Sequence, residues 1–330
     1  MSLIIIALIS FWDHSCETNA GIAYNNNIFA YSNEYIQDFM DQVRPYRFPF
    51  ETYDDLELSQ NISLLLRNKL INKHTTTFSI RSRIRHFLIN KQKDYLSANL
   101  GIRQSFGKWA VKISYDLLPY YLIRYYRDPN GTGTDYAGCR VDYHEITGKV
   151  SISPSDKINF HFYYSRIDEK YHNPFAIYDA ANNSGAVQLE QQVSPYLDLK
   201  LSYTFRASRT DTIGIDSIED SPDASYDQHC PMLDIVYRRQ MLLPVEIAIR
   251  YAYKFRNHLS DIPTDLLHFG RQDHIHDLNT SISFRLRTGM KFKCSFEQTW
   301  RNTTSTINNS IGQIKNYSQT KIDGALILYY

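Results

Sequence analysis

Apolar and polar side chains alternate along most of this chain, and this alternation restricts its possible folds more strongly than any other feature of the sequence. The pattern is clearest in residues 96–103, 158–165, 197–205, 245–255 and 292–300. A period of two residues is that of a β-strand, in which successive side chains point to opposite faces of a sheet. The chain is therefore predicted to be all-β.

Turn residues interrupt the alternation and divide the chain into about fourteen predicted strands. The strands cover residues 18–25, 56–70, 75–89, 93–105, 108–126, 136–153, 157–166, 184–192, 196–207, 230–239, 244–255, 275–287, 291–301 and 315–330. Most of them reach the roughly nine to eleven residues that a tilted strand needs to cross a bilayer. Strands of soluble proteins have about five or six residues, so these lengths favour a membrane-spanning barrel over a soluble sandwich.

The connections between the predicted strands alternate between short and long. Short turns fall at residues 72–74, 107, 153–156, 194–195, 240–243 and 288–289. Longer segments fall at 26–54, 127–135, 167–183, 208–229, 256–274 and 302–314, and residues 90–92 are a short connection on the long side. This arrangement is typical of outer-membrane proteins. We therefore predict a single up-and-down antiparallel transmembrane β-barrel with long extracellular loops and both termini on the periplasmic side.

Composition agrees with this prediction without proving it. The chain has 26 tyrosines and 17 phenylalanines, and tyrosine suits a membrane–water boundary because its ring is apolar and its hydroxyl is polar. Both residues are also good strand formers. After residue 12 no continuous apolar run is long enough for a transmembrane helix, which excludes a helical membrane protein. The net charge of +1 gives no reason to expect nucleic-acid binding.

The chain begins with an apolar segment, LIIIALISFW, at residues 3–12. It is too short to span a bilayer as a helix and is similar to the core of a signal peptide, although no Lys or Arg precedes it. We predict that residues 1–17 are an export signal, cleaved between Ser15 and Ala20, and that residues 18–330 form the barrel. The alternative is an ordinary first strand or a buried segment.

The last predicted strand ends in an aromatic residue. Ile322, Gly324, Leu326, Leu328 and Tyr330 share one face, and Tyr330 is the final residue. This resembles the C-terminal signature of bacterial outer-membrane proteins, in which an alternating strand with a terminal aromatic is read by the assembly machinery. The resemblance implies that Leu326, Leu328 and Tyr330 are an assembly signal. It also implies a location in the outer membrane of a Gram-negative-type bacterium, with the bilayer, lipopolysaccharide and the assembly machinery as partners.

The polar faces of the strands carry the functional prediction. Arg81, Arg83 and Arg85 alternate with Ile80, Ser82 and Ile84, and each arginine would cost about 2–4 kcal/mol at the lipid midplane. These arginines are therefore expected to point into the lumen. The other residues expected there are the bases Arg103, Lys112, Lys200, Arg250, Lys254, Arg285, Lys291 and Lys293 and the acids Asp116, Asp142, Asp198, Glu246, Glu297 and Asp323.

Basic side chains around a pore favour anions. We therefore predict a channel for passive diffusion of small polar solutes with a mild anion preference. The alternative is a lumen in which these bases only neutralise acids across strands. A structural or adhesive barrel, with its long loops as the working surface, is a further alternative.

The first long loop contains SNEYIQDFMDQV at residues 32–43. Ser32 could cap a short helix that carries Tyr35, Ile36 and Phe39 on its apolar side. Such a helix would either fold into the mouth as a constriction or lie on the rim.

Pro119 interrupts the predicted strand DLLPYYLIRYY. Proline removes a hydrogen-bond donor from the ladder, so it marks a bulge or a gap unless it lies near a strand end. The fatty-acid transporter family, which also has fourteen strands, has wall kinks of this kind, and the resemblance implies sideways release of hydrophobic ligands. Those proteins carry an N-terminal hatch, for which too few residues precede the first predicted strand, so lateral transport is an alternative only.

Evidence for catalysis or metal binding is weak. In HFGRQDHIHD, His274 and His276 would share a strand face, which permits metal binding. The segment also resembles the acid–histidine pairs of outer-membrane proteases, although those enzymes have fewer strands and a third element is missing. No phosphate-binding loop, GxSxG or HExxH motif occurs. We predict no enzyme activity, no cofactor and no metal site, and an outer-membrane hydrolase is the least favoured alternative function.

The four cysteines, Cys16, Cys139, Cys230 and Cys294, match no zinc or redox spacing. Cys139 and Cys230 both fall near predicted loop bases on one side of the barrel. A disulfide between them and unpaired thiols are both compatible with the sequence.

Overall fold

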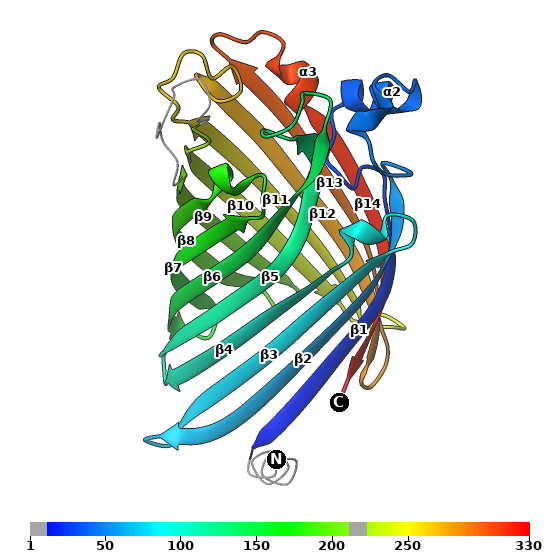
Figure 1. Cartoon of the computed structure of the whole chain (residues 1–330). Coiled ribbons are helices and arrows are strands. Elements are labelled where there is room, and N and C mark those ends of the chain that lie inside the picture. The colour runs from blue at the N-terminus through cyan, green and yellow to red at the C-terminus, as the bar shows by residue number, and fades with distance from the viewer. Residues whose placement is uncertain (1–11, 211–222) are drawn as a thin grey trace, which may run out of the picture.

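The protein is described by a computed structural model that covers residues 12–210 and 223–330. In this part of the chain fourteen strands form one closed barrel, each antiparallel to its sequence neighbours, and β1 closes on β14 (Figure 1). The predicted up-and-down antiparallel barrel is therefore confirmed. None of the helices in the described residues has the length and apolar character needed to cross a membrane.

The strands are β1 (Asp13–Asn25), β2 (Asp55–Ile71), β3 (His74–Phe87), β4 (Tyr95–Phe106), β5 (Trp109–Arg127), β6 (Tyr136–Ser155), β7 (Ile158–Tyr171), β8 (Ala180–Ser194), β9 (Leu197–Thr210), β10 (Tyr226–Arg239), β11 (Val245–His258), β12 (Arg271–Arg287), β13 (Met290–Ser305) and β14 (Tyr317–Tyr329). Each predicted strand has a counterpart here. Several are longer than predicted near the long loops, and β10 and β12 begin four residues before their predicted starts at 230 and 275.

The first strand also starts earlier than predicted. β1 begins at Asp13, which pairs with Arg67 of β2, and not at residue 18. The predicted cleavage region from Ser15 to Ala20 therefore lies within a paired strand. Residues 1–11 of the signal-like segment lie outside the described residues.

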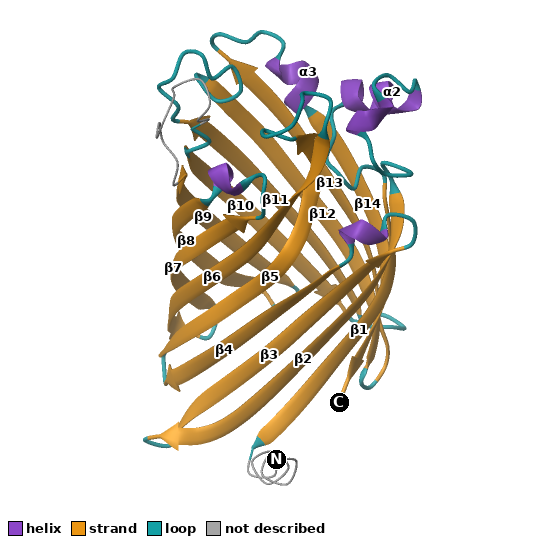
Figure 2. Cartoon of the chain, in the orientation of Figure 1, coloured by secondary structure: helices purple, strands orange, loops and turns teal. Residues whose placement is uncertain are grey.

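The two ends of the barrel differ. One end carries the short turns, the start of β1 and the end of β14, whereas the other carries the long loops with α2 (Asn33–Met40) and α3 (Ile311–Lys315) (Figure 2). Two of the short turns contain glycines in the left-handed region, Gly107 with φ of 66° and Gly289 with φ of 76°. Glycine adopts this conformation without steric cost, so these turns can be tight.

The outer face of the barrel is apolar. Many large hydrophobic side chains are exposed, including Leu100 (51%) and Ile146 (58%), and they occupy alternate positions along the strands. A soluble monomer rarely exposes an apolar patch larger than a few hundred Å². Acyl chains would cover this surface, as they cover the apolar band of a transmembrane barrel.

The wall parts between β4 and β5 near the long loops. Their pairing stops at Ala98 and Leu117, although β5 continues to Arg127, and Figure 1 shows β5 turning away from β4. Pro119 lies two residues after Leu117, and Tyr120 has a φ of 52°. β5 is also irregular against β6 on both sides of Tyr121. The prediction that Pro119 marks a bulge or a gap is therefore confirmed.

Side chains close the gap by replacing missing backbone partners. The Lys93 Nζ donates hydrogen bonds to the carbonyl oxygens of Leu122 (2.8 Å) and Ile123 (3.0 Å). The Tyr31 hydroxyl, from the first long loop, lies 3.4 Å from both the backbone N and the backbone O of Tyr125. An unpaired strand edge is very unfavourable in hydrocarbon, so these contacts stabilise the parted wall.

An apolar cluster fills the same gap. This gap cluster consists of Ile28, Phe29, Tyr31, Phe87 and Leu122. The ring of Phe29 stacks on Phe50 at 4.4 Å between centroids. Lys93, in the short 3-10 turn Lys91–Lys93, is buried beside this cluster, and burial lowers the pKa of its amine to about 7.

The helix predicted in the first long loop is present as α2. Ser32 is its N-cap, and the Ser32 side chain accepts a hydrogen bond from the Tyr35 N–H at 3.2 Å. The helix lies at the rim, beyond the strand ends (Figure 2), and none of its residues is buried. The position of α2 is that of the rim alternative, and its Tyr35 also lines the cavity at this end of the barrel.

Candidate functional site

The inner face of the barrel carries the residues predicted for the lumen. Cross-strand partners lie on the same face of a sheet, and the registers connect the predicted positions to one another and not to the exposed apolar belt. The residues placed on this face are Arg81, Arg83, Arg85, Arg103, Lys112, Asp116, Asp198, Lys200, Glu246, Arg250, Lys254, Arg285, Lys291, Lys293, Glu297 and Asp323. Arg81, Arg103 and Arg250 are exposed although they point inward, so the barrel interior is accessible to water.

The prediction that Asp142 points into the lumen is wrong. It pairs in register with Lys170 on the outer face, accepts a hydrogen bond from the Tyr120 N–H at 2.6 Å, and forms an ion pair with His172 at 3.2 Å. At this height the inward positions of β6 are held by its neighbours Val141 and Tyr143. Near the rim the apolar-out pattern no longer holds, which is why the prediction for Asp142 was wrong.

Seven of the predicted lumen residues form ion pairs across the inner face. Lys200 pairs with Glu190 at 3.1 Å and Lys254 with Asp277 at 2.6 Å, both on the β8–β12 wall. The seven paired residues are Arg85, Asp198, Lys200, Glu246, Arg250, Lys254 and Lys291. On the β8–β12 wall the geometry is that of the charge-paired alternative, in which bases and acids neutralise each other.

The opposite wall carries bases without acidic partners. Arg103 on β4, Lys112 on β5 and Lys149 on β6 stand directly opposite one another in register, near the short turns. We call these three residues the basic row. None of them forms an ion pair with another described residue, and Arg81 and Arg83 on β3 also lack one. Like charges directly opposite each other are destabilising, so an anion near the basic row would be attracted.

Lys149 was not predicted from the sequence, although a signal was present. It alternates with the outward residues Val150 and Ile152 and therefore belongs to the inward face of β6.

Two of the remaining predicted acids accept hydrogen bonds from amides. Asp116 accepts from Asn99 at 2.8 Å, and Glu297 accepts from Asn279 at 2.9 Å.

A cavity of about 590 Å³ opens at the long-loop end of the barrel. We call it the vestibule. Eight tyrosines line it, together with six arginines and Lys315, whereas Glu169 is the one lining carboxylate among the described residues. Burial, together with the nearby Arg271 and Arg124, lowers the pKa of Lys315 in α3 to about 7. The vestibule is thus an electropositive, tyrosine-rich space.

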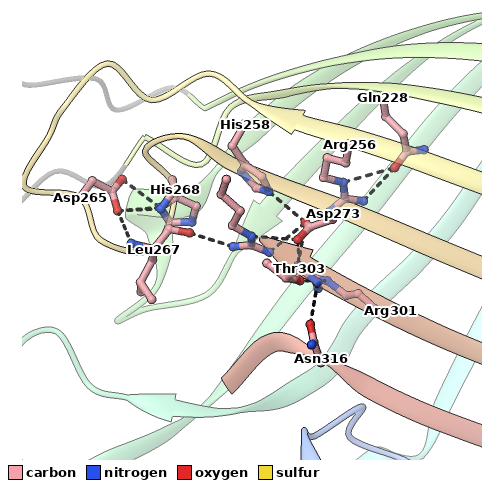
Figure 3. Close-up of polar contacts among 11 residues, drawn as sticks. Gln228, Arg256, His258, Asp265, Leu267, His268, Asp273, Arg301, Thr303 and Asn316 are labelled. Carbon is pink, nitrogen blue, oxygen red and sulfur yellow. Dashed lines mark hydrogen bonds and ion pairs between the residues drawn. The ribbon is translucent and has the colours of Figure 1, made fainter. Parts of the chain in front are cut away.

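One side of the vestibule is fixed by a polar cluster around Asp273 (Figure 3). Asp273 is 0% exposed and accepts hydrogen bonds from Arg271 (3.0 Å, twice), Arg301 (2.7 Å), Thr303 (2.8 Å) and His258 (3.1 Å). These donors come from β11, β12 and β13. We call the five residues the Asp273 cluster, and its contacts tie three strand ends together.

The two histidines whose shared strand face permitted metal binding contact tyrosines. His274 and His276 lie on the outer face, where their Nδ1 atoms contact the hydroxyls of Tyr253 (2.6 Å) and Tyr251 (2.7 Å). The His276 ring also stacks on Trp300 at 5.1 Å. In the described part of the chain, no group of three or more His, Cys, Asp or Glu side chains is placed to hold a metal ion.

The cysteines and the C-terminal residues also have defined positions. All four cysteines are free thiols, so Cys139 and Cys230 do not form a disulfide. Leu326 and Leu328 lie in β14, between β1 and β13. The backbone N–H and carbonyl of Tyr330 are hydrogen bonded to Cys16 at 2.8 and 3.0 Å, so the chain end completes the barrel seam.

Comparisons with known proteins agree with this architecture. No protein-family model and no curated protein matches the chain. Among solved structures, the outer membrane channel DcaP of Acinetobacter baumannii matches with a TM-score of 0.52 and 9% identity, covering 97% of this chain and 98% of that chain. A bacterial polysaccharide outer membrane secretin matches with a TM-score of 0.51 and 9% identity, covering 95% and 98%. At this identity the similarity shows the fold alone, and that fold is the transmembrane β-barrel of outer-membrane proteins.

Proposed function

We propose that this protein is an outer-membrane channel through which small polar solutes diffuse passively, with a preference for anions. The closed barrel and its water-accessible interior support a channel. The basic row, formed by Arg103, Lys112 and Lys149 without acidic partners among the described residues, is the observation that carries the anion preference. Unpaired charges of one sign inside a low-dielectric wall raise the local concentration of ions of the opposite sign.

The charge-paired wall sets the expected strength of this preference. Pairs such as Lys200–Glu190 present little net charge to a passing solute, so only one side of the lumen attracts anions strongly. A moderate selectivity is therefore proposed, in which cations still pass. Catalysis is not part of this proposal, because the inner-face carboxylates of the described residues contact bases, amides or hydroxyls, as Arg250, Asn99 and Ser295 do for Asp234, Asp116 and Asp323.

The selectivity is tested by removing charge from the basic row. In planar bilayers under a salt gradient, the reversal potential of the wild-type channel should indicate anion preference. The double variant K112Q/K149Q should shift this potential toward zero or to the cation side, because two unpaired charges leave the pathway. The matched control K254Q/D277N removes a neutral pair from the β8–β12 wall and should leave the potential nearly unchanged.

Three results would contradict the proposal. They are cation selectivity of the wild type, an equal shift in the control variant, and the absence of discrete conductance steps from a barrel that is folded. The folded state is established independently by the gel shift between boiled and unboiled samples in detergent. Absent steps from a folded barrel would favour a structural or adhesive role.

We further propose how the chain reaches the membrane. Residues 1–17 would direct export, with Asp13–Glu17 also forming the start of β1, and the assembly machinery would read the face of β14 that carries Leu326, Leu328 and Tyr330. The surrounding bilayer and lipopolysaccharide would then contact the apolar outer face. Replacement of Tyr330 by Ser should lower the amount of barrel in the outer membrane, measured by fractionation, without changing the conductance of the channels that form.

The parted wall favours a second candidate function, sideways release of an apolar ligand. The separation of β4 from β5 beyond Leu117 is the observation that supports it. The gap cluster and Lys93 close this path in the structure, so release would require the first long loop to move. Wild-type channels that bind a spin-labelled fatty acid in the lumen would support this candidate, and exclusion of that probe would contradict it.

A further inference from the structure

Three arginines of the vestibule have neutral neighbours, and two of them are held in place by hydrogen bonds. Arg124 donates from Nε to the Tyr126 hydroxyl at 2.9 Å and from Nη1 to the Ala30 carbonyl at 3.3 Å. Arg256 donates to the side-chain oxygen of Gln228 at 3.0 and 3.3 Å. No described carboxylate forms an ion pair with either guanidinium, so both remain unneutralised.

Arg206 follows the same pattern. Arg206 lies near the neutral Tyr226 hydroxyl, and its buried Nε has no hydrogen-bond partner among the described residues. The Tyr226 ring also lies under the Arg256 guanidinium, at 4.0 Å from the ring centroid. Glu169 does not neutralise these arginines by direct contact, because it is hydrogen bonded to the Tyr171 hydroxyl and the Asn182 amide, both at 3.3 Å.

The contrast with the Asp273 cluster separates two roles for arginine in one cavity. Arg271 and Arg301 are buried and both contact the Asp273 carboxylate, so their charge is used within the fold. Arg124, Arg206 and Arg256 are half-buried, line the cavity and have neutral partners. Guanidiniums that are oriented in advance and not neutralised are suited to bind a carboxylate with two parallel hydrogen bonds.

The tyrosines and the volume of the vestibule indicate what the rest of the ligand is like. Tyrosine rings, among them Tyr126, Tyr171 and Tyr178, surround the arginines, and such rings stack on flat rings and donate hydrogen bonds to polar substituents. A volume of about 590 Å³ lies in the range of small-molecule sites. It is far larger than chloride or acetate requires.

We propose that the vestibule is a binding site for a ring-bearing carboxylate, an aromatic acid or a sugar acid, held through its carboxylate by Arg124, Arg206 and Arg256 and through its ring by the surrounding tyrosines. This inference rests on the proposed function, since it gives the substrate class that enters the channel. Occupation of the vestibule places such an anion at the extracellular mouth, above the basic row.

Calorimetry on the folded barrel in detergent tests the site. Benzoate and galacturonate are the probes, benzamide and galactose are their neutral counterparts, and acetate is the small anion. At least one ring-bearing acid should bind measurably more tightly than its neutral counterpart and than acetate. The acid that binds distinguishes an aromatic substrate from a sugar substrate. Equal binding of acid and neutral counterpart, or no binding of either acid, would overturn the proposal.

Variants assign the binding to the vestibule. R206Q/R256Q should lower the affinity for the ring-bearing acid by about tenfold or more, because each hydrogen bond to a charged group contributes about a factor of ten to affinity. The matched control R81Q/R83Q removes the same charge from the inner face of β3, outside the basic row, and should leave the affinity within about twofold. Equal losses in both variants would mean general attraction and would overturn the site. R124Q provides an independent test should the double variant fail to fold.

The outcomes separate this inference from the proposed function. If K112Q/K149Q loses selectivity and the wild type binds neither acid, the channel proposal stands and the vestibule site is refuted. Acid binding that is lost in R206Q/R256Q, in a barrel that conducts no ions, would retain the site and refute the channel.

Discussion

Replacing Asp273 by Ala should strongly destabilise the barrel. The carboxylate is fully buried and accepts hydrogen bonds from Arg271, Arg301, Thr303 and His258. Its removal leaves two buried guanidiniums without a counter-charge. Breaking a buried ion pair by removing one partner costs about 3–5 kcal/mol. The temperature at which the folded band disappears from a detergent gel should fall clearly.

Asp277→Ala is the matched control for this experiment. Asp277 lies on the same strand and the same inward face, but its partner Lys254 is half-exposed and the pair is accessible to solvent. Ion pairs of this kind are worth about 0–1 kcal/mol, so the control barrel should unfold near the wild-type temperature. Equal losses in the two variants would refute the special role of the Asp273 cluster. Asp273→Asn, which keeps one acceptor oxygen, should give an intermediate result.

Phe29→Ala should open the parted wall. Phe29 is buried in the gap cluster and stacks on Phe50 at 4.4 Å, and truncation of a buried phenylalanine costs about 3–5 kcal/mol. Because the first long loop is attached to β5 through this cluster, the loop should detach while the strands stay paired. Trypsin should then cleave after Arg47, which is buried while the loop is attached, much faster than in the wild type, and the single-channel current should become noisier.

Phe39→Ala controls for the loss of an aromatic ring from the same loop. Phe39 is half-buried and packs on Phe48 and Phe50, with no ring contact to the described residues of β5. It should therefore change the current noise much less than Phe29→Ala. Lys93→Met gives an independent test, because it keeps the apolar stem but removes the donors to two β5 carbonyls. Unchanged proteolysis and noise in both Phe29→Ala and Lys93→Met would show that the loop does not close the wall.

The fold followed from the sequence because lipid and water face opposite sides of every strand. A guanidinium such as that of Arg81 is costly in lipid, so alternation with Ile80 was enough to place it inside. The strand ends were less predictable. β12 begins with Arg271 and Asp273, where both faces are polar and no alternation marks the strand, yet the backbone ladder continues because it needs only main-chain groups.

The candidate site was only partly predictable. The inward position of Lys200 followed from alternation, but its pairing with Glu190 depends on the register between two strands, which a single sequence does not reveal. The vestibule was missed altogether. Arg124, Arg206 and Arg256 come from β5, β9 and β11 and line one cavity only because the barrel closes, so no local sequence pattern predicts that they share a site.

The departure of β5 from β4 has a consequence for biogenesis. A β-barrel whose strands pair one after another is normally closed once its first and last strands pair. Here the joining of β1 and β14 leaves the gap between β4 and β5 open. The gap is filled by the first long loop, which connects β1 to β2. Assembly of the barrel is therefore complete only when this loop has packed against β5. A molecule in which it has not yet packed exposes an unpaired edge of β5, to which another chain could bind.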